Sequence, residues 1–246
     1  MAGVVSILIL VGVIVALVLV LGGDEDKKVE TVPPTTSAPT TQATPMPADE
    51  RFSLLINQLE SNNVTAPLVD LFPDNPDYYD PSYLEGLVNN DYCKSKAFDC
   101  AMSWILYEDE FPPESNDIVD RFGMAAFYYS LGGEGWKNST NWLSPESYCE
   151  WHGIKCNRGQ TDVEEIDLSD NDLNGELPLE LALVDSAAVI SLKNNAITGK
   201  LNGDIFAGMP NLFVLYLQDN LLTGAIPDNL HDGGLGKYCI DIFTNN

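Results

Sequence analysis

Four segments of the chain repeat one pattern of apolar and polar residues, and this repetition constrains the fold more than any other feature. Residues 163–171, 187–195 and 212–220 read apolar-x-x-apolar-x-apolar-x-x-Asn, and residues 237–245 keep the pattern except at their first position. The asparagines that close the four segments are 24, 25 and 25 residues apart. One such segment cannot bury its own apolar side, so this period predicts a stack of similar coils.

Each segment predicts a short strand that ends at its asparagine. Two apolar residues alternate with polar ones, as in a strand with one buried face. These pairs are Ile166/Leu168, Ile190/Leu192, Leu215/Leu217 and Ile240/Ile242. We expect the asparagine amides to stack in one column and to pair with backbone groups that the turning coil would otherwise bury unpaired. A Gly-x-(Leu/Ile) motif follows in three repeats and allows a sharp bend.

In these motifs the chain resembles the plant-type leucine-rich repeat of receptor-like ectodomains and polygalacturonase-inhibitor-like proteins. The resemblance implies an α/β fold class: a leucine-rich repeat solenoid, a short right-handed superhelix, over residues 161–246, with three full repeats and a fourth truncated one. It also implies an α-helical, disulfide-containing N-terminal cap over residues 116–160. The cap ends in a C-x-W-x-G-I-x-C box, where Cys149 pairs with Cys156 and a disulfide-closed hairpin carrying Trp151 covers the first coil.

Residues 49–115 predict an acidic helical region upstream of the cap. Apolar residues recur at helical spacing around Leu55 and again around Met102, and prolines divide the region into short helices. Cys93 and Cys100 flank a helix or turn, and we predict that they form a disulfide. A helix is expected from Asp117 onward, and two consecutive glycines stop it after residue 131.

The first 48 residues predict a membrane tether. An uninterrupted apolar run of 18 residues, from Val4 to Leu21, is long enough to cross a bilayer as a helix, so residues 1–23 are expected to be an anchor. The alternative is a signal peptide that is removed, which would make the protein secreted. Residues 24–48 form a charged, Thr/Pro-rich stalk.

Two glycosylation sequons, at Asn63 and Asn138, agree with an oxidising compartment, as the expected disulfides do. The bulk of the chain is therefore expected outside the plasma membrane. The fifth cysteine, Cys239, stays open between a buried thiol and a partner beyond the last residue.

Charge and residue types exclude several classes of function. With 12 Lys and Arg against 37 Asp and Glu, the formal charge is −25, which argues against nucleic acid as a partner. Residues 170–175 match half of a calcium loop, but its twelfth position is Leu181 and not glutamate. The two histidines cannot form a multi-histidine metal site. We expect no cofactor, no metal and no catalysis.

The resemblance places a binding site on the concave sheet, at the polar positions around each strand. The candidate residues are Asp167, Ser169, Ser191, Lys193, Tyr216, Gln218, Asp241 and Phe243. Aromatic residues favour recognition. The expected function is receptor-like recognition or adhesion, with a protein, peptide or glycan as ligand. A secreted inhibitor-like or cell-wall-associated binding protein is the second hypothesis, and an enzyme-accessory role of the acidic helices is the third.

Overall fold

The structure, a computed structural model, describes residues 46–61, 90–112, 117–231 and 240–241. They belong to one unit, Ala43–Asn246, and the other unit, Met1–Gln42, lies outside the described residues. Within the described ranges, no helix combines the length and apolar character needed to span a bilayer. Several predictions fall outside these ranges: the apolar run from Val4, almost all of the stalk, and the residues Asn63, Cys239 and Phe243.

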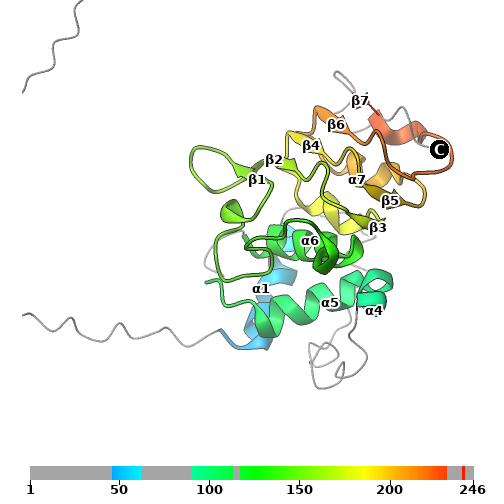
Figure 1. Ribbon diagram of the computed structural model, residues 1–246. Coiled ribbons are helices and arrows are strands. Elements are labelled where there is room, and N and C mark those ends of the chain that lie inside the picture. Colours follow the sequence, from blue (N-terminus) through cyan, green and yellow to red (C-terminus); the bar gives the residue numbers. More distant parts are fainter. Residues whose placement is uncertain (1–45, 62–89, 113–116, 232–239, 242–246) are drawn as a thin grey trace, which may run out of the picture. The chain divides into compact units, whose positions relative to one another are not determined.

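The repeats form a five-stranded sheet in the order β1-β2-β4-β6-β7 (Figure 1). The strands are β1 (Ile154–Cys156), β2 (Val163–Asp167), β4 (Val189–Ser191), β6 (Val214–Tyr216) and β7 (Ile240–Asp241). β1 runs antiparallel to β2, and the later pairs are parallel. The register places Ile166, Ile190 and Leu215 side by side, and all three are buried. The predicted stack of repeats is confirmed.

The outer side of each coil is short and irregular. β3 (Asn174–Glu176) pairs in parallel with β5 (Ala196–Thr198), and the return segments are η5 (Leu179–Leu183), α7 (Gly203–Ala207) and η6 (Asp228–His231). Gly175 has a φ of +148°, and a Cβ placed on it would lie 1.9 Å from the Ser130 carbonyl oxygen. This close approach to the cap admits only glycine.

The asparagine column is confirmed by its hydrogen bonds. The side-chain oxygen of Asn195 accepts from the backbone N–H groups of Asn171 and Leu173, both at 3.0 Å, and its amide donates to the Leu168 carbonyl at 2.9 Å. Asn171 exchanges two bonds with the backbone of Asn138, at 2.8 and 3.0 Å. The column therefore begins in the cap, one rung before the first repeat.

The helices form one layer, in which α6 packs against the first repeat and the others pack around α6. They are α1 (Ala48–Ser61), α4 (Asn90–Ser95), α5 (Ala97–Ser103), the π-helix η2 (Trp104–Glu108) and α6 (Asp117–Ser130). In Figure 1 they lie together on one side of the coils, and α6 lies next to the repeats. The predicted disulfide Cys93–Cys100 closes the corner between α4 and α5. One continuous apolar core runs from Leu55 to Leu230, so the helices and repeats share their interior.

The second predicted disulfide, Cys149–Cys156, is also present, but the segment that it closes is not itself a hairpin. It contains a turn of 3-10 helix, η4 (Tyr148–Glu150), and then β1, which forms its hairpin with β2. Gly153, at a φ of +81°, directs the chain into β1. Trp151 is 1% exposed, and its ring centroid lies 5.1 Å from that of Trp142. The tryptophan is buried among cap and helix residues, and its role as a cover of the first coil stays a prediction.

A buried ion cluster joins the cap to the helices, and sequence patterns did not predict it. Arg121 of α6 donates from Nε and Nη2 to the two carboxylate oxygens of Asp109, at 2.8 and 2.5 Å. Arg51 of α1 lies 3.7 Å from the same carboxylate. All three side chains are at most 3% exposed. The guanidinium of Arg121 also lies over the ring of Trp151, 5.0 Å from its centroid.

Candidate functional site

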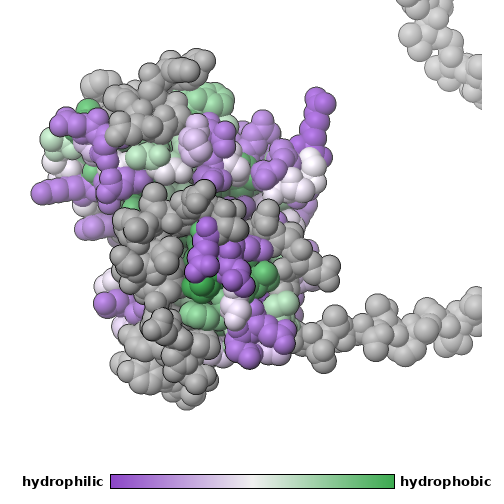
Figure 2. Space-filling view, turned by 180° about the vertical axis from the view of Figure 1, so that it is seen from behind, coloured by the Kyte–Doolittle hydropathy of each residue, from purple (hydrophilic) through white to green (hydrophobic). Residues whose placement is uncertain are grey.

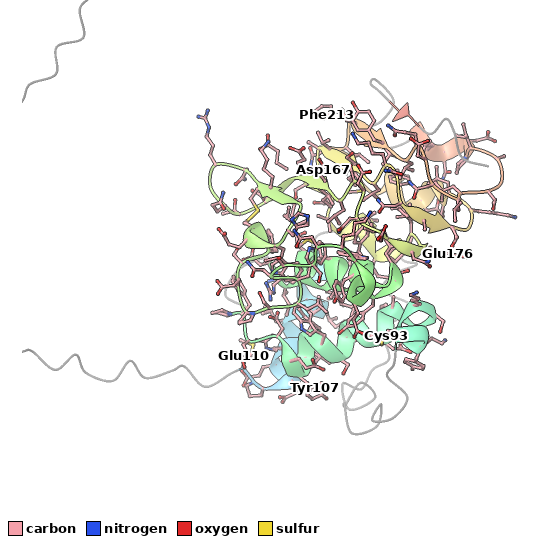
Figure 3. All side chains as sticks on the ribbon, viewed as in Figure 1. Cys93, Tyr107, Glu110, Asp167, Glu176 and Phe213 are labelled. Atoms are coloured by element: carbon pink, nitrogen blue, oxygen red, sulfur yellow. A yellow bond between two sulfur atoms is a disulfide. The ribbon has the colours of Figure 1, made fainter. Side chains whose placement is uncertain are left out.

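The candidate site is the outward side of the five-stranded sheet, which we call the sheet face. Its rows consist of alternate strand residues that point away from the core. They are Lys155, Glu165, Val189 and Val214 in one row and Asp167, Ser191 and Tyr216 in the next. Ser169, Lys193 and Gln218 follow directly after the strands. In Figure 3, Asp167 and Phe213 are labelled on this side of the unit.

The first half of the sheet face is polar and internally bonded. Ser169 donates from its hydroxyl and from its backbone N–H to one carboxylate oxygen of Asp167, at 2.6 and 3.1 Å. Its hydroxyl also lies 2.8 Å from that of Ser191, which is only 6% exposed. Lys155 and Glu165 form an ion pair at 3.0 Å. Of the predicted site residues here, Asp167 is exposed and offers a carboxylate, whereas Ser191 presents little surface.

The second half of the sheet face carries aromatic side chains and has fewer internal hydrogen bonds and ion pairs. Tyr216 and Val214 are half-buried, and Phe213, which precedes Val214 in the chain, is 40% exposed. Lys193 is exposed and forms no ion pair with any residue of the described ranges. The side-chain oxygen of Gln218 is buried without a hydrogen-bond partner among the same residues. Amphipathic side chains of this kind can contribute both contact area and hydrogen bonds.

The last predicted site residues are only partly described. The backbone of Asp241 pairs with Tyr216 in β7, as the repeat predicts, but its side chain and the whole of Phe243 lie outside the described residues.

The predicted sequon residue Asn138 belongs to the start of the asparagine column. Its side-chain oxygen accepts from the backbone N–H and the hydroxyl of Thr140, at 3.0 and 2.7 Å. Its amide nitrogen lies 3.1 Å from His152 Nδ1. Glycosylation at this asparagine stays a prediction.

The polar residues that match half of a calcium loop, near the first repeat, shape the turn of the coil. Asp170 and Asp172 adopt left-handed conformations at φ of +58° and +59°, and Asn171 is committed to the asparagine column. Across the described ranges, no three side chains of His, Cys, Asp or Glu are grouped so that they could hold a metal ion.

Aspartates gather at the flank of the sheet, where β2 begins. Burial, and after it the nearby charges of Asp185, Asp117 and Asp162, raise the pKa of Asp120 from 3.8 to about 8. The hydroxyl of Tyr148 opposes this shift. The raised pKa means that the folded state holds a proton at Asp120 that the unfolded chain releases above about pH 4.

We therefore expect the replacement Asp120→Asn to stabilise the protein, and more so at pH 8 than at pH 5. In the wild type, the contribution of Asp120 to the free energy of unfolding falls as the pH rises from about 4 to 8. Asparagine does not ionise, so it removes that loss. Because the side chain still reaches water, the gain at pH 8 is on the order of 1–2 kcal/mol. Urea denaturation at both pH values measures it. An equal effect at the two pH values would contradict this reasoning, and Asp204→Asn, at an exposed aspartate on α7, is the control.

Comparisons with known proteins agree with the geometry of the repeats. Residues 162–183 match the Leucine Rich Repeat family model. The chain is 39% identical over 120 residues to the leucine-rich repeat receptor-like serine/threonine-protein kinase RGI4 of Arabidopsis thaliana, a match that covers 44% of this chain and 10% of the relative. It is 34% identical over 99 residues to Phytosulfokine receptor 1 of the same plant, which covers 40% of this chain and 9% of the relative.

Among solved structures, the chain is similar to the Arabidopsis receptor kinase HAESA in complex with the peptide hormone IDA and the co-receptor SERK1. The sequence identity is 31%, the TM-score is 0.40, and the match covers 46% of this chain and 20% of that chain. The chain thus spans about a tenth of the length of the curated relatives that it matches.

Proposed function

We propose, from the premise that this chain is a plant-type leucine-rich repeat protein, that it recognises a protein or peptide on its sheet face outside the cell. The premise rests on the repeat match and on the relatives. The receptor-like role extends to this chain what the names of those relatives say of them. In this proposal the protein binds a partner and catalyses no reaction.

The observation that carries the proposal is the division of the sheet face. One half offers the exposed carboxylate of Asp167, and the other offers the half-buried Tyr216 with the exposed Lys193 and Phe213. An extended peptide that crosses the strands would meet an acidic end and an aromatic end. Aromatic residues such as tyrosine are enriched among the residues that carry most of the binding energy at recognition surfaces.

The proposal includes a tether through the apolar run from Val4 to Leu21, with the repeats outside the plasma membrane. A secreted, inhibitor-like or cell-wall-associated protein is the alternative, and a glycan is the alternative ligand. Mass spectrometry of the purified protein distinguishes tether from secretion: a mature chain that begins near Gly23 would show that the apolar run is removed.

The binding site is tested by the double replacement of Tyr216 and Lys193 with alanine. The probe is a peptide selected from a random library on the wild-type protein, and its Kd is measured by calorimetry. Loss of an aromatic anchor and of a charged contact is expected to weaken binding by about 30-fold or more.

The matched control replaces Leu221 and Lys200, an exposed apolar residue and an exposed lysine away from the sheet face. This control is expected to bind as the wild type does. If selected peptides bind both double variants equally well, the sheet face is not the site of recognition.

A further inference from the structure

A cavity lies away from the sheet face, between the helices and the first repeat. Its volume is about 750 Å³. One wall is the disulfide-closed corner at 94–99, and the other is the segment 175–180 with Ser130 beside it. In Figure 3, Cys93 and Glu176 mark the two walls on the same side of the unit. We call this cavity the corner groove.

Both walls of the corner groove are held in place. The Cys93–Cys100 disulfide brackets the first wall. The second is fixed to the end of α6, because the Ser130 hydroxyl donates to the Glu176 carbonyl at 2.6 Å and the Asn174 N–H donates to the Leu131 carbonyl at 2.9 Å. The groove is therefore a preformed site, which lowers the cost of ordering a ligand in it.

The two lysines of the groove each lie close to a group that favours a positive charge. A Cβ placed on Gly132 would lie 3.2 Å from the Lys94 ammonium nitrogen, so this cation lies against the C-terminal end of α6, where a helix favours positive charge. Burial raises the pKa of Asp99, and the nearby charge of Lys96 partly opposes this shift. Glu176 and Glu180 have no cationic partner within the described residues.

Glu180 is the unusual member of this pair. It is 6% exposed and lines the groove, and among the residues that the structure describes its carboxylate has a hydrogen bond only from its own backbone N–H. Burial raises its pKa as a consequence. A buried carboxylate without a counter-charge is costly, and a cation that entered the groove would remove that cost.

From this geometry we infer that the corner groove binds a basic side chain of a peptide, with Glu180 on its floor as the carboxylate that receives it. The Glu176 side chain instead lies against Gly199 of the next coil, so it contributes less. Arginine fits best, because its planar guanidinium presents several N–H donors to carboxylates at once. The chain's formal charge of −25 would draw a basic partner toward the protein as a whole. The inference adds a second site and does not depend on the sheet face.

The test uses the full chain and acetyl-Gly-Arg-Gly-amide as the probe, followed by NMR titration. The neutral analogue with citrulline in place of arginine has nearly the same shape. We expect saturable binding of the arginine peptide and at least about tenfold weaker binding of the citrulline peptide, because only the guanidinium carries charge. The Glu180→Gln variant is expected to lose binding by about tenfold or more, and Glu176→Gln by less. Glu164→Gln, at an exposed glutamate on β2, is the matched control.

Stability separates a binding role of Glu180 from a structural one. Glutamine keeps the bond to its own backbone N–H and removes the buried charge, so Glu180→Gln is expected to unfold at the same Tm as the wild type or higher. A lower Tm, or unchanged peptide binding in this variant, would overturn the inference.

The Tyr216/Lys193 double variant keeps the two proposals apart. It is expected to bind the arginine peptide as the wild type does. Loss of binding in that variant would place the arginine on the sheet face instead of in the corner groove. Failure of the arginine peptide to bind at all would remove the corner groove and leave the sheet face as a separate question.

Discussion

Replacing Asp109 with alanine is expected to lower the free energy of unfolding by about 3–5 kcal/mol, because it leaves two buried arginines without their shared carboxylate. Arg121 loses both of its bonds to the carboxylate, and Arg51 loses its ion pair at 3.7 Å. The remaining hydrogen bonds of Arg121 are to the carbonyls of Glu146 and Ser144, both at 2.9 Å. They cannot offset the repulsion between two cations in an apolar interior.

The position of this cluster makes its effect global. Arg51 lies on α1 and donates to the carbonyls of Ile105 and Phe111, at 2.9 and 3.0 Å. Arg121 lies on α6, the helix that packs against the repeats. Because the apolar core is continuous from helices to repeats, we expect one unfolding transition in the variant, as in the wild type, and not early loss of the helices alone.

Guanidinium or urea denaturation followed by tryptophan fluorescence and by circular dichroism measures this effect. Glu110→Ala removes an exposed carboxylate from the residue immediately after Asp109 and is the control, with an expected change within about 0.5 kcal/mol. A loss below about 1 kcal/mol in Asp109→Ala would show that the arginines do not need this carboxylate, and the buried ion cluster would then be no structural link.

The parts of the fold that sequence predicted are those set by local periodicity. The alternation around Ile190 and the spacing of Asn171, Asn195 and Asn220 follow from the same coil geometry at every repeat, so one rule accounts for all of them. The two disulfides are equally local, since each closes a separation of seven residues. The family resemblance added the cap, and the buried Trp151 agrees with it.

The parts that sequence missed depend on contacts between segments with no common period. Arg121 lies on α6 and Asp109 directly follows η2, and nothing near either residue in the sequence distinguishes it from an ordinary surface charge. The corner groove joins Lys94 to Glu180 across two structural elements, which no spacing rule connects. One feature of the sequence did point to the cluster. Arg51 lies within an acidic amphipathic helix, where an arginine is expected to pair with a carboxylate.

The candidate site was predicted better in position than in detail. The register brings Asp167, Ser191 and Tyr216 into one row, as the repeat predicts. Side-chain bonding within that row was not visible from the pattern, because the Ser169–Ser191 contact depends on rotamers. As a result, Ser191 is less available to a ligand than its place in the repeat suggested.

The asparagine column supplies the second large effect: Asn220→Ala is expected to lower the free energy of unfolding by about 3 kcal/mol. Asn220 is 3% exposed, its side-chain oxygen accepts from the Ile197 N–H at 3.0 Å, and its amide donates to the carbonyls of Leu192 and Leu217 at 2.9 and 3.1 Å. Alanine leaves these groups buried and unpaired, at a cost of about 1–3 kcal/mol for each group that water cannot reach.

Two further variants test whether the lost hydrogen bonds cause the expected fall in the free energy of unfolding. Asn195→Ala removes the same type of bonds from a half-buried asparagine, so water can replace some of them and the expected loss is smaller than for Asn220→Ala. Asn211→Ala removes an exposed asparagine with one bond, 3.2 Å to the Asp185 carbonyl, and is the control. Urea denaturation ranks the three variants. If Asn220→Ala costs no more than the control, the column merely accompanies the coil, and apolar burial alone holds the repeats in register.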